Sequence, residues 1–195
     1  MFTTHRRGRF VFVLILALAL CTAATADAAA QQRKPTTESE VLKQYQARID
    51  EYMELHTRLE KESPPLKTAD DPEQIRLSQK VLADKIRAER RNPAQGAIFT
   101  PETRTVFRRR LREQLEGPKG AELRRAIEDD APSPIPLRVH AEYPPGWPLS
   151  SVPPTIIASL PKLPADLEYR FVGRDLILHD VHANLIIDFI LNAIR

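Results

Sequence analysis

Apolar side chains recur at alternating three- and four-residue steps between residues 37 and 62, and polar residues fill the positions between them. This spacing predicts an amphipathic helix with one narrow apolar side. Pro64 and Pro65 follow and prevent the helix from continuing, because proline has no backbone N–H to donate. We refer to the apolar side of this helix as the narrow face, which consists of Leu42, Tyr45, Ile49, Tyr52, His56 and Leu59.

A second helix is predicted to begin after Asp71, which can cap it, with Pro72 in the first turn, and to extend to about residue 91. Ile75, Leu82 and Ile86 form its apolar stripe. Because the loop between the first two helices is short, we expect them to form an antiparallel helical hairpin.

Capping signals also define two shorter helices. Thr100 is a candidate N-cap with Pro101 after it, and the third helix is expected to stop before the Gly-Pro pair at 117–118. A fourth segment is expected from Ala121 to about Asp129. Regular helix is excluded from most of 132–164, which holds ten of the 17 prolines. There we expect an extended wrap that contains one strand at 137–143 and a helical turn near 155–160.

The C-terminal pattern predicts a three-stranded meander. Apolar and polar residues alternate in 167–172, as in a half-buried strand, and Gly173 can form a tight turn into a second strand at 175–179. Residues 180–184 are typical of a turn, and 185–190 form the third strand. The expected fold class is therefore α+β, with an N-terminal antiparallel helical hairpin plus shorter helices, a proline-rich wrap and a small C-terminal antiparallel sheet.

The first thirty residues have the layout of a secretory signal peptide: arginines, an apolar run from Phe10 to Leu20, and then small residues. The A-x-A pattern allows cleavage after Ala26, Ala28 or Ala30. The apolar run is shorter than the roughly 20 residues of a membrane-spanning helix, so we expect no stable anchor after cleavage. This organisation divides the chain into a signal peptide at 1–30, a helical region at 31–131, and a proline-rich and β region at 132–195.

Export changes the meaning of the composition. The whole chain has 29 Lys and Arg, 26 Asp and Glu, and a net charge of +3, but removal of residues 1–30 leaves 26 basic against 25 acidic residues. A nearly neutral chain gives no support for nucleic-acid binding. Because Leu20 precedes the single Cys21 where a lipoprotein signal has a small residue, lipidation is not expected, and the mature chain contains no cysteine.

The sequence contains no nucleophile elbow, phosphate-binding glycine loop or zinc-helix motif. We therefore expect a non-enzymatic protein without a cofactor, and we leave open a hydrolase that uses a pair of Asp or Glu residues as acid and base. The alternative is a metal-binding or metal-responsive protein that uses His140, His179 and His182, since imidazole nitrogen is a common metal ligand. On a strand, His179 and His182 would point to opposite faces, so the same residues are also compatible with an ordinary turn.

Three stretches carry a resemblance to a group of known proteins: "GAIFTPE" at 96–102, "LRVHAEYP" at 137–144, and the closing segment 152–190. Together they resemble uncharacterised bacterial exported proteins that have a helical front half and a C-terminal β-hairpin. The resemblance implies a periplasmic or envelope setting and no assigned activity. The expected role is a binding or interaction module for a protein or a cell-envelope component, with the narrow face as the interaction surface.

Overall fold

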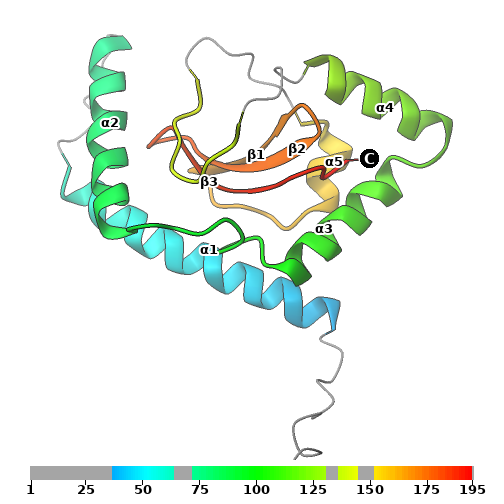
Figure 1. Cartoon of the computed structure of the whole chain (residues 1–195), viewed down its shortest axis with the longest axis horizontal. Helices are drawn as coiled ribbons and strands as arrows, with labels where there is room; N and C mark the ends of the chain where they lie inside the picture. The colour runs from blue at the N-terminus through cyan, green and yellow to red at the C-terminus, as the bar shows by residue number, and fades with distance from the viewer. Residues whose placement is uncertain (1–36, 64–71, 131–135, 145–151, 195) are drawn as a thin grey trace, which may run out of the picture. The chain divides into compact units, whose positions relative to one another are not determined.

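The computed structural model describes residues 37–63, 72–130, 136–144 and 152–194, all within one compact unit that spans 37–195 (Figure 1). Five helices are found in these residues: α1 (Glu38–Lys61), α2 (Pro72–Glu89), α3 (Pro101–Gln114), α4 (Gly117–Asp130) and α5 (Pro154–Ser159). The three strands are β1 (Leu167–Val172), β2 (Asp175–Asp180) and β3 (Leu185–Ile190). The α+β prediction is confirmed.

Local sequence signals account for the helix ends. Thr37 caps α1: its side chain accepts a hydrogen bond from the Glu40 backbone N–H, and the Glu40 carboxylate accepts one from the Thr37 backbone N–H. Thr100 caps α3 as predicted. Helix α3 ends at Gln114, before the Gly-Pro pair at 117–118 as predicted, but α4 begins at this pair and not at Ala121. Gly117 has a φ of 72° at the junction, and proline is tolerated in a first turn.

The narrow face of α1 is part of the hydrophobic core. Tyr45, Ile49, Tyr52 and Leu59 are at most 3% exposed, and Leu42 is partly buried against the same core. The helix lies against the sheet, where the hydroxyls of Tyr45 and Tyr169 hydrogen-bond at 2.9 Å. The interpretation of this face as an interaction surface is therefore corrected, because the protein's own sheet and helices cover it.

Helices α1 and α2 contact each other in the second half of each helix. The Lys85 ammonium donates to the Glu62 carbonyl at 2.6 Å, and the Arg58 guanidinium lies 3.7 Å from the Glu89 carboxylate. The buried side of α2 contributes Leu82, Ala83 and Ile86 to the core. The first half of α2 is mostly exposed.

The sheet has the order β1-β2-β3 with antiparallel pairing, as predicted (Figure 1). Side chains of one face, among them Leu176, Leu178 and Leu185, join the main core with α1, α2 and α3. Side chains of the other face, including Ile177 and Ile186, form a second cluster with residues 137–143. Both faces of the sheet are covered, which explains why every residue of β3 is buried.

Residues 137–143 do not form the predicted strand. His140 has a φ of 65°, and only Glu142 forms a β-bridge, to Leu185. The segment still forms two backbone hydrogen bonds with Ile186 of β3, of which His140 N–H to the Ile186 carbonyl is the shorter at 2.7 Å, and a third with the carbonyl of Asn184, the residue before β3. Its alternating apolar residues pack on the second cluster. The alternation of apolar and polar residues in 137–143 therefore reflects burial of one side of an irregular segment and not a β-strand.

The helical turn expected near 155–160 is present as α5, which contacts α3. The predicted signal peptide at 1–30 lies outside the described residues. Within the part of the chain that the structure describes, no helix is both long and apolar enough to cross a membrane.

Candidate metal centre

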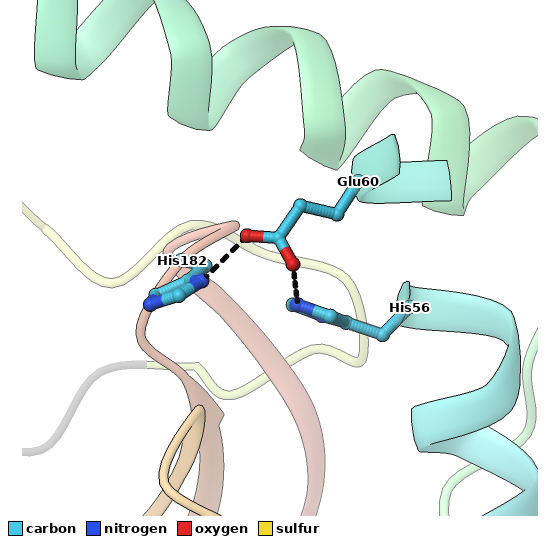
Figure 2. Close-up of side chains that lie close together, drawn as sticks. All are labelled: His56, Glu60 and His182. Atoms are coloured by element: carbon cyan, nitrogen blue, oxygen red, sulfur yellow. Dashed lines mark hydrogen bonds and ion pairs between the residues drawn. The ribbon is translucent and has the colours of Figure 1, made fainter. Parts of the chain in front are cut away.

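His56 is the polar member of the narrow face, and its side chain has no exposed surface. Its Nδ1 lies 2.7 Å from an oxygen of Asp180, the last residue of β2. Its Nε2 is buried without a hydrogen-bond partner and points toward Glu60, one helical turn further along α1, at 3.7 Å (Figure 2). A buried ring nitrogen without a partner costs free energy, so its neighbourhood calls for an explanation.

Asp180 is the anchor that orients the imidazole. It is fully buried, and its Oδ2 accepts a hydrogen bond from the Tyr52 hydroxyl at 2.5 Å in addition to the contact with His56. Its Oδ1 accepts the backbone N–H of Ala183 at 2.8 Å, in the turn after β2. The carboxylate therefore joins two side chains of α1 to the turn between β2 and β3.

His182 comes from that same turn and faces His56 across the Glu60 carboxylate (Figure 2). Its Nδ1 lies 2.9 Å from Glu60 Oε1, and its Nε2 lies 3.4 Å from an Asp166 carboxylate oxygen. The centroids of the two imidazole rings are 5.9 Å apart. Each imidazole thus has one nitrogen toward an outer carboxylate and the other toward Glu60.

In this arrangement, the two inner ring nitrogens and the Glu60 carboxylate can all be hydrogen-bond acceptors that face one another. If each outer carboxylate accepts the imidazole N–H, then His56 Nε2 and His182 Nδ1 both direct a lone pair toward the Glu60 carboxylate. With these tautomers, a cation among the three atoms, either a proton on a ring or a metal ion, removes the repulsion; the other tautomer of His182 instead donates its Nδ1–H to Glu60. One ligand atom from each of His56, Glu60 and His182 can be chosen so that all lie within 4.8 Å of one another.

The distances fit a small transition-metal ion. Zinc binds imidazole nitrogen and carboxylate oxygen at roughly 2.0–2.2 Å, which places neighbouring ligands of a tetrahedral site about 3.3 Å apart. The separations from the Glu60 carboxylate lie on either side of that value, at 3.7 Å from Oε2 to His56 Nε2 and 2.9 Å from Oε1 to His182 Nδ1. A carboxylate on the far nitrogen of each imidazole is also the usual support of a metal-binding histidine.

The charges of the cluster oppose its burial. Burial alone would lower the pKa of His56, but the hydrogen bond and charge of Asp180, with the charges of Glu60 and Asp166, outweigh it and raise that pKa above its usual value. Burial alone would raise the pKa of Asp180, but His56, Tyr52 and a backbone N–H hold it below its usual value. The site therefore favours an ionised carboxylate and a cation beside it.

His179, which the sequence placed in the candidate metal site, has a different environment. It lies on β2, buried, with Nδ1 2.8 Å from Glu168 and Nε2 3.1 Å from the Asn184 side-chain oxygen. Its ring packs beside Tyr143 at 5.2 Å between centroids, with the second cluster. Because both nitrogens have partners, His179 does not join His182 in this structure.

His140 also lies apart from the cluster. Its Nε2 is 3.3 Å from the guanidinium of Arg90. Burial, followed by the positive charges of Arg90 and Arg87, lowers the pKa of His140 to about 4. Of the three histidines in the sequence-based site, only His182 enters the group that the structure assembles. Among the described residues, no second group of at least three His, Cys, Asp or Glu side chains meets the same spacing.

Comparison of the chain with protein-family models, curated proteins and solved structures found no significant match. Function must therefore be inferred from the site alone.

Two members of the cluster were not recognised as ligands from the sequence. The sequence pattern places His56 on the narrow face and indicates no role for Glu60. Their i,i+4 spacing places them on one side of a helix and is the signal that could have paired them. Their third partner, His182, is 122 residues from Glu60 along the chain, and only the packing of the sheet on α1 brings it near.

Proposed function

We propose that the protein binds a divalent transition-metal ion through His56, Glu60 and His182. The observation that carries this proposal is the buried Nε2 of His56, which has no hydrogen-bond partner and faces the Glu60 carboxylate, whose other oxygen faces the His182 ring. A set of two imidazoles and one carboxylate leaves room for a further ligand on the metal, as in many zinc sites.

The donor atoms restrict the class of metal. Imidazole nitrogen favours Zn²⁺, Ni²⁺, Co²⁺ and Cu²⁺, whereas Ca²⁺ and Mg²⁺ prefer sites made of oxygen. No cysteine belongs to the cluster, so a thiolate-dependent ion such as Cu⁺ is disfavoured. We therefore expect binding of zinc or nickel and negligible binding of magnesium.

Calorimetric titration of the purified protein with zinc tests the proposal. His182→Ala and Glu60→Gln should each weaken or abolish binding; both side chains are about 40% exposed, which favours folding of the variants. Glu54→Gln, an exposed glutamate of the same helix, is the matched control and should bind as the unchanged protein does. His179→Ala separates the two histidine sets, because the structure predicts that it keeps zinc binding if it folds.

Metal binding should also stabilise the fold. A ligand that binds only the native state adds about 2.7 kcal/mol at one hundred times its dissociation constant. A zinc-dependent rise in melting temperature, absent in His182→Ala, would support the proposal. The competing account is that a proton on His56 is the only cation in the cluster. Absence of both binding heat and thermal shift with zinc, nickel and cobalt would favour that account.

We further propose that the protein is exported, which rests on the pattern of residues 1–30 and on the resemblance to exported bacterial proteins. Mass determination of the chain recovered from the periplasm of a bacterial host would test this, with a mature start at residue 27, 29 or 31 as the expected result. Recovery of the full-length chain from the cytoplasm would contradict it. The burial of the narrow face argues against its use as a surface for a partner.

A further inference from the structure

The three side chains of the candidate centre differ sharply in exposure. His56 has no exposed surface, whereas Glu60 is 40% and His182 is 39% exposed. A metal ion among them would be buried on the side of α1 and the sheet, and it would face solvent between Glu60 and His182. With three protein ligands, the remaining coordination position of a tetrahedral ion would lie on that exposed side.

The surrounding charges select the ligand for this position. Glu60, Asp166 and Asp180 carry three negative charges near the two imidazoles, and a divalent ion compensates only two of them. Arg90 lies over the ring of Tyr52, 5.2 Å from its centroid, so its contact is with that ring and not with the residues that face the ion. An incoming anion would be repelled by this excess, whereas a neutral donor would not.

We propose that the metal-loaded centre is an open site that takes a neutral nitrogen ligand, such as an imidazole, in its solvent-facing position. This inference rests on the proposed function, since it requires the metal to be bound by His56, Glu60 and His182. The ligand is either a free small molecule or the histidine of a second copy of the chain. A closed structural site would leave no such position.

Cobalt(II) tests this directly, because its visible absorption changes when a ligand enters the coordination sphere. The full chain would be loaded with cobalt and titrated with imidazole and, separately, with azide. We expect a saturable spectral change with imidazole and an affinity for azide that is about tenfold weaker. Asp166→Asn, which removes one negative charge without removing a ligand, should raise the affinity for azide several-fold.

Each outcome decides between the alternatives. Cobalt binding without any response to imidazole would show a closed site and overturn the inference, while metal binding as such would stand. Azide binding as tight as that of imidazole would overturn the charge argument. Failure to bind cobalt, zinc or nickel would refute the proposed function and the inference together. Sedimentation of the cobalt form identifies the source of the ligand, because a dimer that imidazole dissociates would indicate a histidine of a second copy.

Discussion

The outer carboxylates Asp180 and Asp166 occupy equivalent positions behind the two imidazoles, but only Asp180 is buried. Replacing each by asparagine keeps the shape of the side chain and removes its charge. In Asp180→Asn, the new amide group must face either the donors at Oδ2, from Tyr52 and His56, or the donor at Oδ1, from Ala183. At least one buried donor then loses its acceptor.

The expected cost follows from burial. Hydrogen bonds to a charged acceptor contribute about 1.5–3 kcal/mol each, and breaking a buried ion pair costs about 3–5 kcal/mol. We therefore expect Asp180→Asn to lower the free energy of unfolding of the metal-free protein by about 3–5 kcal/mol, a large part of a typical total of about 5–15 kcal/mol. Asp166 is 28% exposed and its partner 39%, so Asp166→Asn should cost less than about 1 kcal/mol.

Metal affinity should respond differently from stability. Loss of the carboxylate behind a metal-binding histidine typically lowers metal affinity by about 10- to 100-fold. Both variants should therefore bind zinc more weakly, although only Asp180→Asn should be markedly less stable. Urea denaturation without metal measures the first quantity. Calorimetry with zinc, under conditions where circular dichroism shows both variants folded, measures the second. Equal stability of the two variants, or unchanged zinc affinity in both, would refute this reasoning.

Three further predictions concern other positions. Asp188 is fully buried and accepts four backbone N–H groups, so Asp188→Asn should lose about 3 kcal/mol or more in urea denaturation. The pKa of the His140 imidazole is about 4 in the folded protein, against roughly 6.5 in the unfolded chain, so NMR should show titration of this ring near pH 4. Because the folded state binds this proton less readily than the unfolded state does, the contribution of His140 to stability falls as the pH drops from about 6.5 to 4. Gly120→Ala would place a Cβ 2.2 Å from the backbone of the preceding turn and should cost about 2 kcal/mol, whereas Gly117→Ala meets only its positive φ and should cost about 1 kcal/mol.

Local signals were sufficient for most of the secondary structure. Periodicity and capping residues located α1 and α3 to within a few residues, and turn chemistry located the meander. The prediction was wrong at 137–143 because alternation reports which side chains are buried, and an irregular segment beside an edge strand can bury alternate residues as a strand does. The positive φ at His140 that interrupts this segment has no marker in the pattern.

The candidate centre could be predicted only in part, for a related reason. Consecutive residues of a strand point to opposite faces, so His179 and Asp180 lie on opposite faces of β2. His179 points toward the second cluster, and Asp180 points toward α1. Which of them would meet a metal ligand depended on which element covered each face, and sequence periodicity does not contain that information.

What the sequence did contain was a histidine in a place of the narrow face that an apolar residue would ordinarily occupy. A buried imidazole must find a partner on the surface it packs against, so this single exception marked the point where α1 and the sheet had to supply compensating charge. His56, together with Glu60 one turn away, makes the interface between α1 and the sheet a candidate for metal binding.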